Sequence, residues 1–398
     1  MEGFERVVSQ GWLGRLGGAF KGLFAGAILL LVALGLQFWN EGRTLKRDAA
    51  LAEARATVQV VAEARPDASL DGRLVHVSGE AAATDAVTDE EFGVRVPALA
   101  LRRRVEMYQW QEKRERREES QAGGGTRKVT QYRYEMRWDE DLIDSSRFEQ
   151  RSGHENPRAL PYASQTRRAA GVSLGGYTLA PAVAREIGGW EHIPAAQVEL
   201  PPNLAASFRA EERWFVSSSD VGKPMVGDVR VRFERVPAGT VSVIARQQGT
   251  NLVPHSSADG AELLLVDRGQ LGASAMFDAA GTRNSRAGWL LRGVGFALAF
   301  VGFTLLFRPL VVLADVMPLF GRLAGMGSAI VAAICAALTS ALGIGSGWLW
   351  YRPWLSGLIV LALLAAGAWI WYRRDRIAAV PPPPPGPMPP PPPPRAQA

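Results

Sequence analysis

Four long stretches of the chain carry no ionisable side chain, and this segregation constrains the fold more than any other feature. A bilayer core of roughly 30 Å is crossed by about 20 apolar helical residues. A soluble core helix must also turn a polar face to water. The pattern therefore predicts a multi-pass α-helical membrane protein whose four spans cover residues 23–39, 289–307, 323–350 and 353–372.

The first span could also be the core of a signal peptide, because Arg6, Arg15 and Lys21 precede it. Its far end, residues 37–42, reads Gln-Phe-Trp-Asn-Glu-Gly and has no small-residue cleavage pattern. Aromatic residues at that position are typical of a helix anchored at the membrane interface. We therefore expect an uncleaved signal anchor.

Basic residues beside the spans predict the orientation, since cytoplasmic loops carry an excess of Lys and Arg. They place residues 1–22, the loop 308–322 and the tail 373–398 in the cytoplasm. Residues 40–288 then lie on the other side, in the periplasm, the exterior or a lumen. Residues 309–314 are also apolar, so the second span either continues there or bends at Pro309.

Residues 40–288 are long enough for one large domain or two small subdomains. Alternating patterns predict one hairpin over 105–138 that turns at Gly123–Gly125, and a second over 229–245 that turns at 237–239. A helical pattern follows the first span at 45–56. These features predict a mixed α+β domain, mostly antiparallel. Shorter strands are expected at 74–78, 214–218 and 263–266.

The formal charge of +6 invites a nucleic-acid interpretation, but its distribution excludes one. Residues 40–288 hold 34 bases and 35 acids, a net charge of −1. The excess of positive charge therefore lies beside the spans. The charged run 113–119 mixes both signs, so we expect a solvated face there. The one cysteine, Cys335, excludes an intramolecular disulfide framework.

The motifs that could carry chemistry are weak. Residues 171–175 read Gly-Val-Ser-Leu-Gly, but the strand and helix that a Ser173 nucleophile elbow needs do not flank them. His154 and His192 lack zinc-ligand spacing, and His154 lies in a turn pattern. The acids at 139–144 lack the spacing of a calcium loop. We therefore predict no enzyme, no catalytic residue, no metal ligand and no cofactor.

Two features predict partners. Gly14, Gly18, Gly22 and Gly26 share one helix face, which allows close backbone approach. That approach serves either self-association or packing of the first span against the others. In residues 381–394, 12 of 14 are proline, which predicts an extended polyproline tail that is either a docking site or a stiff spacer. Asp315 is expected to pair with a flanking arginine.

Several motifs in order resemble the transmembrane protein 43 family, also called LUMA. They are residues 38–43, 105–110, 153–157, 226–231 and 308–318. The resemblance implies one N-terminal span, a large luminal or periplasmic domain and three C-terminal spans. It also implies residence in the endoplasmic reticulum and inner nuclear membrane in animals, where members organise protein complexes. The Ala/Arg-rich composition and the proline tail favour a bacterial member in the cell membrane, for which lamina partners do not apply.

Our leading hypothesis is a non-enzymatic membrane scaffold that organises membrane protein complexes or membrane domains. Its expected partners are the lipid bilayer, further copies of the chain, other membrane proteins and a cytoplasmic partner of the proline tail, with no nucleic acid. The alternative is a receptor or sensor that binds a ligand with residues 40–288. A transporter is disfavoured, because ion-coupled transport uses ionisable residues within the spans.

Overall fold

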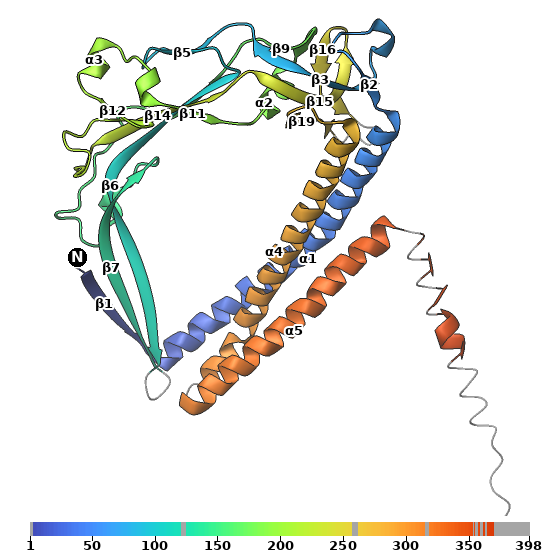
Figure 1. Cartoon of the computed structure of the whole chain (residues 1–398). Coiled ribbons are helices and arrows are strands. Elements are labelled where there is room, and N and C mark those ends of the chain that lie inside the picture. Colours follow the sequence, from blue (N-terminus) through green and yellow to red (C-terminus); the bar gives the residue numbers. More distant parts are fainter. Residues whose placement is uncertain are drawn as a thin grey trace, which may run out of the picture.

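The structure, a computed structural model, describes residues 3–120, 125–256, 262–314 and 318–352, together with 354, 357–358, 361–362 and 364–369. Figure 1 shows a β-rich domain at one end of three long helices. The helices are α1 (Trp12–Thr57), α4 (Ala273–Ala314) and α5 (Pro318–Tyr351).

Within the described residues, these three helices are long and apolar enough to cross a bilayer. They contain the first three predicted spans. The fourth, 353–372, is described only in part, and the proline tail, like Asp315, lies outside the described residues. Helix α4 continues through Pro309 to Ala314, so the apolar residues after the second predicted span extend its helix.

Small side chains bring the three helices together. Ala33 of α1, Ala299 of α4 and Ala336 of α5 are fully buried against one another, with larger apolar residues around them. Close backbone approach of this kind stabilises helix pairs where lipid removes the hydrophobic driving force. The outward-facing residues are large and apolar, as a lipid-facing surface requires.

The extramembrane domain contains two large sheets that meet at the turn between β14 and β15 (Figure 1). The eight-stranded sheet has the order β1-β7-β6-β14-β13-β12, and β8 and β11 pair with β6 and β14. Its strands are β1 (Gly3–Gln10), β6 (Ala100–Ser120), β7 (Thr126–Asp139), β8 (Gln165–Arg168), β11 (Glu191–Ile193), β12 (Arg209–Glu211), β13 (Trp214–Val216) and β14 (Val229–Val236).

The seven-stranded sheet has the order β19-β15-β16-β10-β9-β3-β2, and an additional β15–β3 pairing joins its strands into a closed ring of five. Closing a sheet removes its edges. Its strands are β2 (Gln59–Val61), β3 (Leu74–Ala83), β9 (Val172–Leu174), β10 (Tyr177–Leu179), β15 (Gly239–Gln248), β16 (Asn251–Val253) and β19 (Leu265–Arg268).

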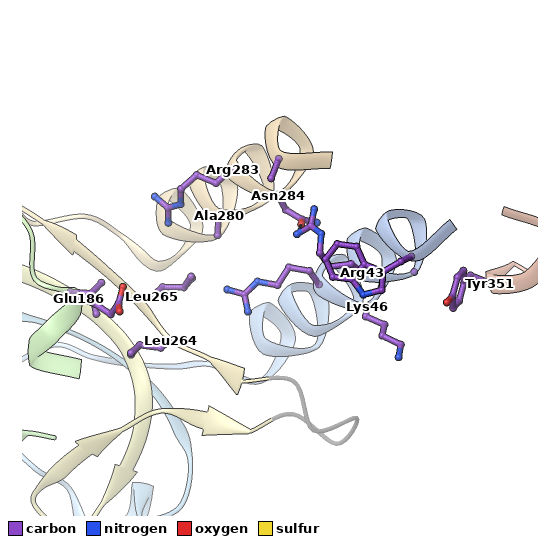
Figure 2. A pocket seen from close by; sticks show the side chains of 14 residues that line it. Arg43, Lys46, Glu186, Leu264, Leu265, Ala280, Arg283, Asn284 and Tyr351 are labelled. Atoms are coloured by element: carbon purple, nitrogen blue, oxygen red, sulfur yellow. Dashed lines mark hydrogen bonds between the residues drawn. The ribbon is translucent and has the colours of Figure 1, made fainter. Parts of the chain in front are cut away.

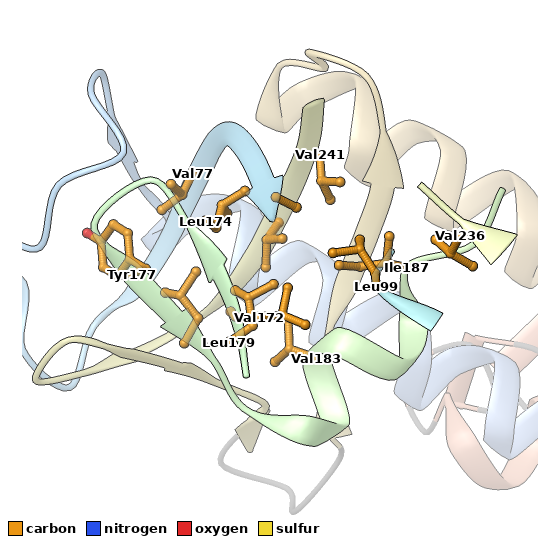
Figure 3. Packing of buried hydrophobic residues seen from close by; sticks show 14 of the residues in the cluster. Val77, Leu99, Val172, Leu174, Tyr177, Leu179, Val183, Ile187, Val236 and Val241 are labelled. Carbon is orange, nitrogen blue, oxygen red and sulfur yellow. The ribbon is translucent and has the colours of Figure 1, made fainter. Parts of the chain in front are cut away.

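The ring encloses an apolar core to which β3, β9, β10 and β15 all contribute (Figure 3). A separate core lies against the eight-stranded sheet around the fully buried Phe92. The remaining elements are short: α2 (Pro181–Glu186), α3 (Pro202–Ala205), β4 (Val87–Asp89), β5 (Val94–Val96), β17 (His255–Ser256), β18 (Glu262–Leu263) and three 3₁₀ turns at Ala68–Leu70, Ser145–Arg147 and Ala195–Gln197.

The domain is therefore mostly β rather than an even α+β mixture. The helical pattern at 45–56 is correct, but it belongs to the continuation of α1 beyond the first span. The antiparallel prediction is confirmed for most strand pairs; β2–β3 and β10–β16 are parallel.

The two predicted hairpins have different outcomes. The first is confirmed in its pairing, because β6 and β7 pair from Met107–Asp139 to Ser120–Thr126; residues 121–124 of the predicted turn lie outside the described residues. The second is wrong in its pairing. Strand β14 pairs with β6, whereas β15 pairs with β3, so the chain crosses between sheets after Val236. Each strand forms an eight-residue ladder with a long partner elsewhere, and alternation alone cannot identify that partner.

The N-terminal segment also differs from expectation. Strand β1 pairs with β7 over eight residues, and Arg6 forms an ion pair with Glu149 at 2.8 Å. The charge map assigns residues 1–22 and 40–288 to opposite sides of a membrane, yet here they share a sheet. The register pairs Gln10 with Thr126, so the beginning of β7 lies beside the beginning of α1 (Figure 1).

The helices enter the domain without a break. Leu51 and Ala54 of α1 and Met276 and Phe277 of α4 are buried with residues of β3, β15 and β19. An α-helix rises 1.5 Å per residue, so the 46 residues of α1 extend about 69 Å, more than twice a bilayer core. The last turns of α1 and the first turns of α4 are thus part of the extramembrane core.

Candidate functional site: a polar junction of three helices

A buried carboxylate, Glu41 of α1, joins all three long helices where they leave the apolar segments. Its side chain is 3% exposed, and both oxygens accept hydrogen bonds from Arg292 of α4, at 2.8 and 2.9 Å. The indole N–H of Trp348 in α5 donates to the same carboxylate at 2.8 Å. A bidentate pair with a third donor satisfies most of the hydrogen-bonding capacity of a buried carboxylate.

A second polar layer lies one turn deeper in the bundle. Gln37 of α1 is buried and donates its amide to the Ser340 hydroxyl of α5 at 2.8 Å. Its carbonyl oxygen is buried without a hydrogen-bond partner among the described residues. A polar contact of this kind favours one rotational setting of α1 against α5, because a rotated helix would leave both groups unpaired in an apolar environment.

A third layer lies toward the domain. Asn40 donates to the Gly288 carbonyl at 3.1 Å, and Asn284 donates to Asp48 at 2.8 Å. Arg43 donates to the Asn284 side-chain oxygen at 3.2 Å. Residues 37, 40, 41, 44 and 48 recur at helical spacing, so these layers form one polar stripe along the side of α1 that faces its neighbours.

Glycines make room for this stripe. A Cβ atom at Gly295 would lie 2.5 Å from the Gln37 side chain, and one at Gly347 would lie 2.8 Å from Cβ of Glu41. One at Gly42 would overlap the Tyr351 ring. The polar side chains and the glycines opposite them thus form complementary halves of one helix interface.

Aromatic side chains mark the same level on the outer surface of the helices. Trp39, Trp289 and Trp350 are all more than half exposed, and Arg292 packs over the Trp289 ring at 4.8 Å. Tryptophan is enriched where lipid hydrocarbon meets headgroups. The junction therefore lies at the boundary between the apolar bundle and the extramembrane domain.

Above this boundary, a cleft of about 650 Å³ opens between α1, α4 and the domain (Figure 2). Four basic residues line it, together with one carboxylate, that of Glu186, and several apolar side chains. The complete lining consists of Trp39, Gly42, Arg43, Lys46, Arg47, Glu186, Leu264, Leu265, Val266, Ala280, Arg283, Asn284, Ala287 and Tyr351.

The residues considered from the sequence lie elsewhere. Ser173 is inside strand β9 and donates to the Ala82 carbonyl at 3.4 Å, which is a sheet environment and not a nucleophile elbow. His154 is buried and stacks on Tyr134 with ring centroids 3.9 Å apart, a packing role. His192 lies 3.4 Å from Glu234. Within the described residues, no group of three or more His, Cys, Asp or Glu could hold a metal ion.

The acids at 139–144 face separate partners. Asp139 pairs with Arg137 at 2.9 Å, Glu140 with Arg104 at 3.4 Å, and Asp144 accepts from Ser146 in a turn.

The 153–157 motif forms hydrogen bonds to the backbone of the long hairpin. Asn156 accepts from the Trp110 N–H at 2.7 Å and donates to its carbonyl at 2.9 Å.

Beside this motif, Glu112 and Tyr134 form a polar pair across the hairpin, with the tyrosine hydroxyl 2.7 Å from the carboxylate. Burial, and then the hydrogen bond to Glu112, raise the pKa of Tyr134 to about 12. Burial alone would raise the pKa of Glu112. Hydrogen bonds from Glu149, Tyr134 and Arg114 outweigh it, so the pKa of this carboxyl is lowered.

Sequence reasoning missed the junction itself. Glu41 and Arg292 stand at the ends of two apolar stretches, and no sequence motif identifies either as a partner of the other. A signal was present in the sequence. Glu41 follows the first span and Arg292 stands at the beginning of the second, and because the two spans run in opposite directions, both charges lie at the same level of the membrane. What the sequence lacked was the identity of the neighbouring helix faces.

Comparisons with known proteins show similarity to one family of membrane proteins. The family model described as transmembrane protein 43 matches residues 107–353. Transmembrane protein 43 of Rattus norvegicus is 35% identical over 368 residues, 89% of this chain and 90% of the rat protein. The Homo sapiens protein is 34% identical over 373 residues, 89% of this chain and 92% of its own length.

The similarity extends beyond vertebrates. The transmembrane protein 43 homolog of Drosophila melanogaster is 29% identical over 358 residues, 88% of this chain and 94% of the fly protein. No solved structure matches the chain. The resemblance seen in the separate sequence motifs is thereby confirmed over nearly the whole length, and the chain belongs to the transmembrane protein 43 family.

Proposed function

We propose that this chain is a non-enzymatic integral membrane scaffold that organises membrane protein complexes or membrane domains. The observation that carries the proposal is the continuity of α1 and α4 from the bundle into the core of the extramembrane domain. These two helices are joined by the hydrogen bonds between Glu41 and Arg292, so they would fix the distance and orientation of the domain relative to the bilayer. Rigid presentation of a large surface suits the positioning of partners.

The glycine face supplies a route to self-association. Gly26 is buried against the Gly302 carbonyl of α4, so the upper end of this face serves packing within the chain. Gly14 and Gly18 are exposed, and a Cβ atom at Gly18 would meet nothing within 4 Å. The lower end of the face is therefore where a second copy would pack.

Crosslinking in native membranes tests the proposal. The wild-type chain should be trapped as oligomers, and Gly18→Leu should reduce their yield severalfold. Gly17→Leu is the matched control, because it adds the same side chain to an open position that lies off the glycine face. A chain that stays monomeric at every crosslinker concentration would refute self-association, and so would equal effects of the two variants.

We place the protein in a cell membrane with both termini cytoplasmic, or in the endoplasmic reticulum and inner nuclear membrane in a eukaryote. The asymmetry of basic residues supports this orientation. A cytoplasmic partner of the 381–394 proline tail belongs to the same proposal. Pull-downs from native membranes with and without residues 381–398 would identify such a partner by its loss from the truncated chain.

A receptor or sensor is the second candidate function. The cleft between the helices and the domain favours it, because a ligand there would contact α1, α4 and β19 at once. Ligand-induced thermal stabilisation of the full chain would support this function.

A further inference from the structure

The cleft above the junction brings together positive charges from two helices. Arg43 and Lys46 come from α1 and Arg283 comes from α4 (Figure 2). Arg47 of α1 is a fourth basic residue in the lining. The one carboxylate in the lining is that of Glu186, so the formal charge of the lining is +3. Like charges that share a partly dehydrated space repel one another, and a bound anion would relieve that repulsion.

Most of this charge is not neutralised by the protein. Arg283 forms an ion pair with Asp267 at 3.2 Å, and Asp48 accepts from Asn284. Among the described residues, no carboxylate forms an ion pair with Arg43, Lys46 or Arg47. Arg47 donates to the backbone carbonyl of Glu262 at 2.8 Å, and Nε of Arg43 is buried with no hydrogen-bond partner in the described part of the chain.

The rest of the cleft is apolar and lies at the membrane boundary. Leu264, Leu265 and Val266 form the domain side, and Trp39 and Tyr351 lie where α1 and α5 leave their apolar segments. A ligand here would place its charge against the arginines and its apolar part beside the exposed surfaces of α1 and α5. That is the chemistry of an amphiphile with an anionic head.

We infer that the cleft binds the phosphate headgroup of an anionic phospholipid from the leaflet that faces the extramembrane domain. Guanidinium groups hold phosphate oxygens in bidentate geometry, and Lys46 adds a mobile point charge. The inference gives the second candidate function a ligand class and does not depend on self-association. The bound lipid would bridge α1, α4 and the domain, reinforcing their relative positions.

Lipid titration of the full-length protein in a neutral detergent tests the inference. We expect dioleoylphosphatidylglycerol to raise the Tm and to bind at least tenfold more tightly than dioleoylphosphatidylcholine. Lys46→Ala combined with Arg47→Ala should weaken phosphatidylglycerol binding about 30-fold, since each basic residue contributes a similar increment near an anionic surface. Lys46→Glu alone should weaken it about tenfold, without removing the Arg47 contact to Glu262.

The matched control is Arg286→Ala, which removes an exposed arginine of α4 that lines a different pocket and is not part of this cleft. It should leave phosphatidylglycerol binding unchanged. Equal binding of the two lipids, or equal losses in Arg286→Ala and Lys46→Glu, would overturn the inference. Stabilisation by inorganic phosphate at the same concentrations as the lipid would assign the site to a soluble anion and overturn the lipid assignment.

The Gly18→Leu variant separates this inference from the scaffold proposal. It should bind phosphatidylglycerol like the wild-type chain even when its oligomers are lost. Native mass spectrometry provides an independent readout, because a bound phosphatidylglycerol adds its own mass to the wild-type chain. The fraction of chain that carries this added mass should be lower for Lys46→Glu than for the wild-type chain at the same lipid concentration, and an equal fraction would count against the cleft as the site.

Discussion

At the scale of single residues, Glu41 shows how one ionisable group can order a helix bundle. Its carboxylate is nearly inaccessible and receives donors from α4 and α5. A charge in this position is costly to desolvate, and only the complete set of partners offsets that cost. The same side chain would therefore stabilise one arrangement of the three helices and oppose the others.

Replacement of Glu41 by Gln should lower the free energy of unfolding by about 3 kcal/mol, because Arg292 keeps its charge but loses the opposing charge and one of its two acceptor oxygens. Thermal unfolding of the full chain in detergent would measure the loss. Combining Glu41→Gln with Arg292→Gln should recover part of it. Asp278→Asn is the control, since the exposed Arg55–Asp278 pair is worth less than about 1 kcal/mol. Comparable losses in the two single variants would contradict a special role for Glu41.

His76 predicts how the stability of the domain depends on pH. It is buried, its Nε2 lies 2.8 Å from the Leu271 carbonyl ahead of α4, and its Nδ1 has no hydrogen-bond partner among the described residues. Burial lowers its pKa from the ordinary 6.5. The unfolded chain therefore binds this proton first. The contribution of His76 to stability is complete above pH 6.5 and is lost as pH falls toward the lower folded-state pKa.

Urea unfolding at pH 7.5 and pH 5.5 would test this. The urea midpoint of the wild-type chain should be lower at pH 5.5 than at pH 7.5. The midpoint of His76→Gln should decrease less over the same change, because the amide can still donate to Leu271 and does not titrate. An unchanged fall in His76→Gln would assign the pH dependence to other groups.

At the scale of elements, close contact between α1 and α4 depends on the absence of side chains at their crossing. A Cβ atom at Gly26 would lie 2.7 Å from the Gly302 backbone oxygen, and no side-chain rotation can relieve that overlap. Gly26→Val should therefore separate the helices and cost about 1–3 kcal/mol. Gly35→Val is the control on the same helix, because that position is open. Equal Tm changes would show that helix propensity, and not packing, determines the effect.

The strands show why pairing is harder to predict than strand position. Residues 229–234 and 240–245 have the alternation of a hairpin, and both segments are strands. Alternation reports which residues face a core, but it does not report which neighbour completes the ladder. Here Val236 pairs with Ala100 and Gly239 with Ala81, so the turn between them separates two sheets.

At the scale of the whole molecule, the pairing of β1 with β7 conflicts with the predicted membrane topology, which assigns residues 1–22 and 40–288 to opposite sides of the bilayer. Pairing with β7 brings the charged end of the hairpin, including Arg116, Arg117 and Arg127, beside the beginning of α1. A bilayer around residues 23–39 lies between that end of α1 and the domain. Charged side chains at the centre of a bilayer cost roughly 2.5–3.5 kcal/mol each. We therefore expect the hairpin to lie outside the bilayer and β1 to separate from β7 when the helices are inserted.

Cysteines at Val8 and Lys128, which are directly paired, test this in a Cys335→Ser background. Opposed residues in an antiparallel pair are close enough for a disulfide. We expect the bridge to form in detergent and to be absent in sealed membrane vesicles. Ser9→Cys should then react with an impermeant maleimide from the side opposite Lys46→Cys. Efficient bridging in vesicles would place residues 1–22 and the domain on the same side and overturn the predicted topology.

The sequence by itself determined three of the membrane helices, the near-neutral extramembrane domain, the long hairpin and the family, because apolar length, charge and alternation are local properties. Only the tertiary structure decided that Glu41 meets Arg292 and Trp348, that β14 and β15 enter different sheets, and that four basic residues line one cleft. These facts depend on which faces of distant segments meet. That choice is made by packing and hydrogen bonding between segments more than 100 residues apart in the chain; Glu41 and Arg292, for example, are 251 residues apart.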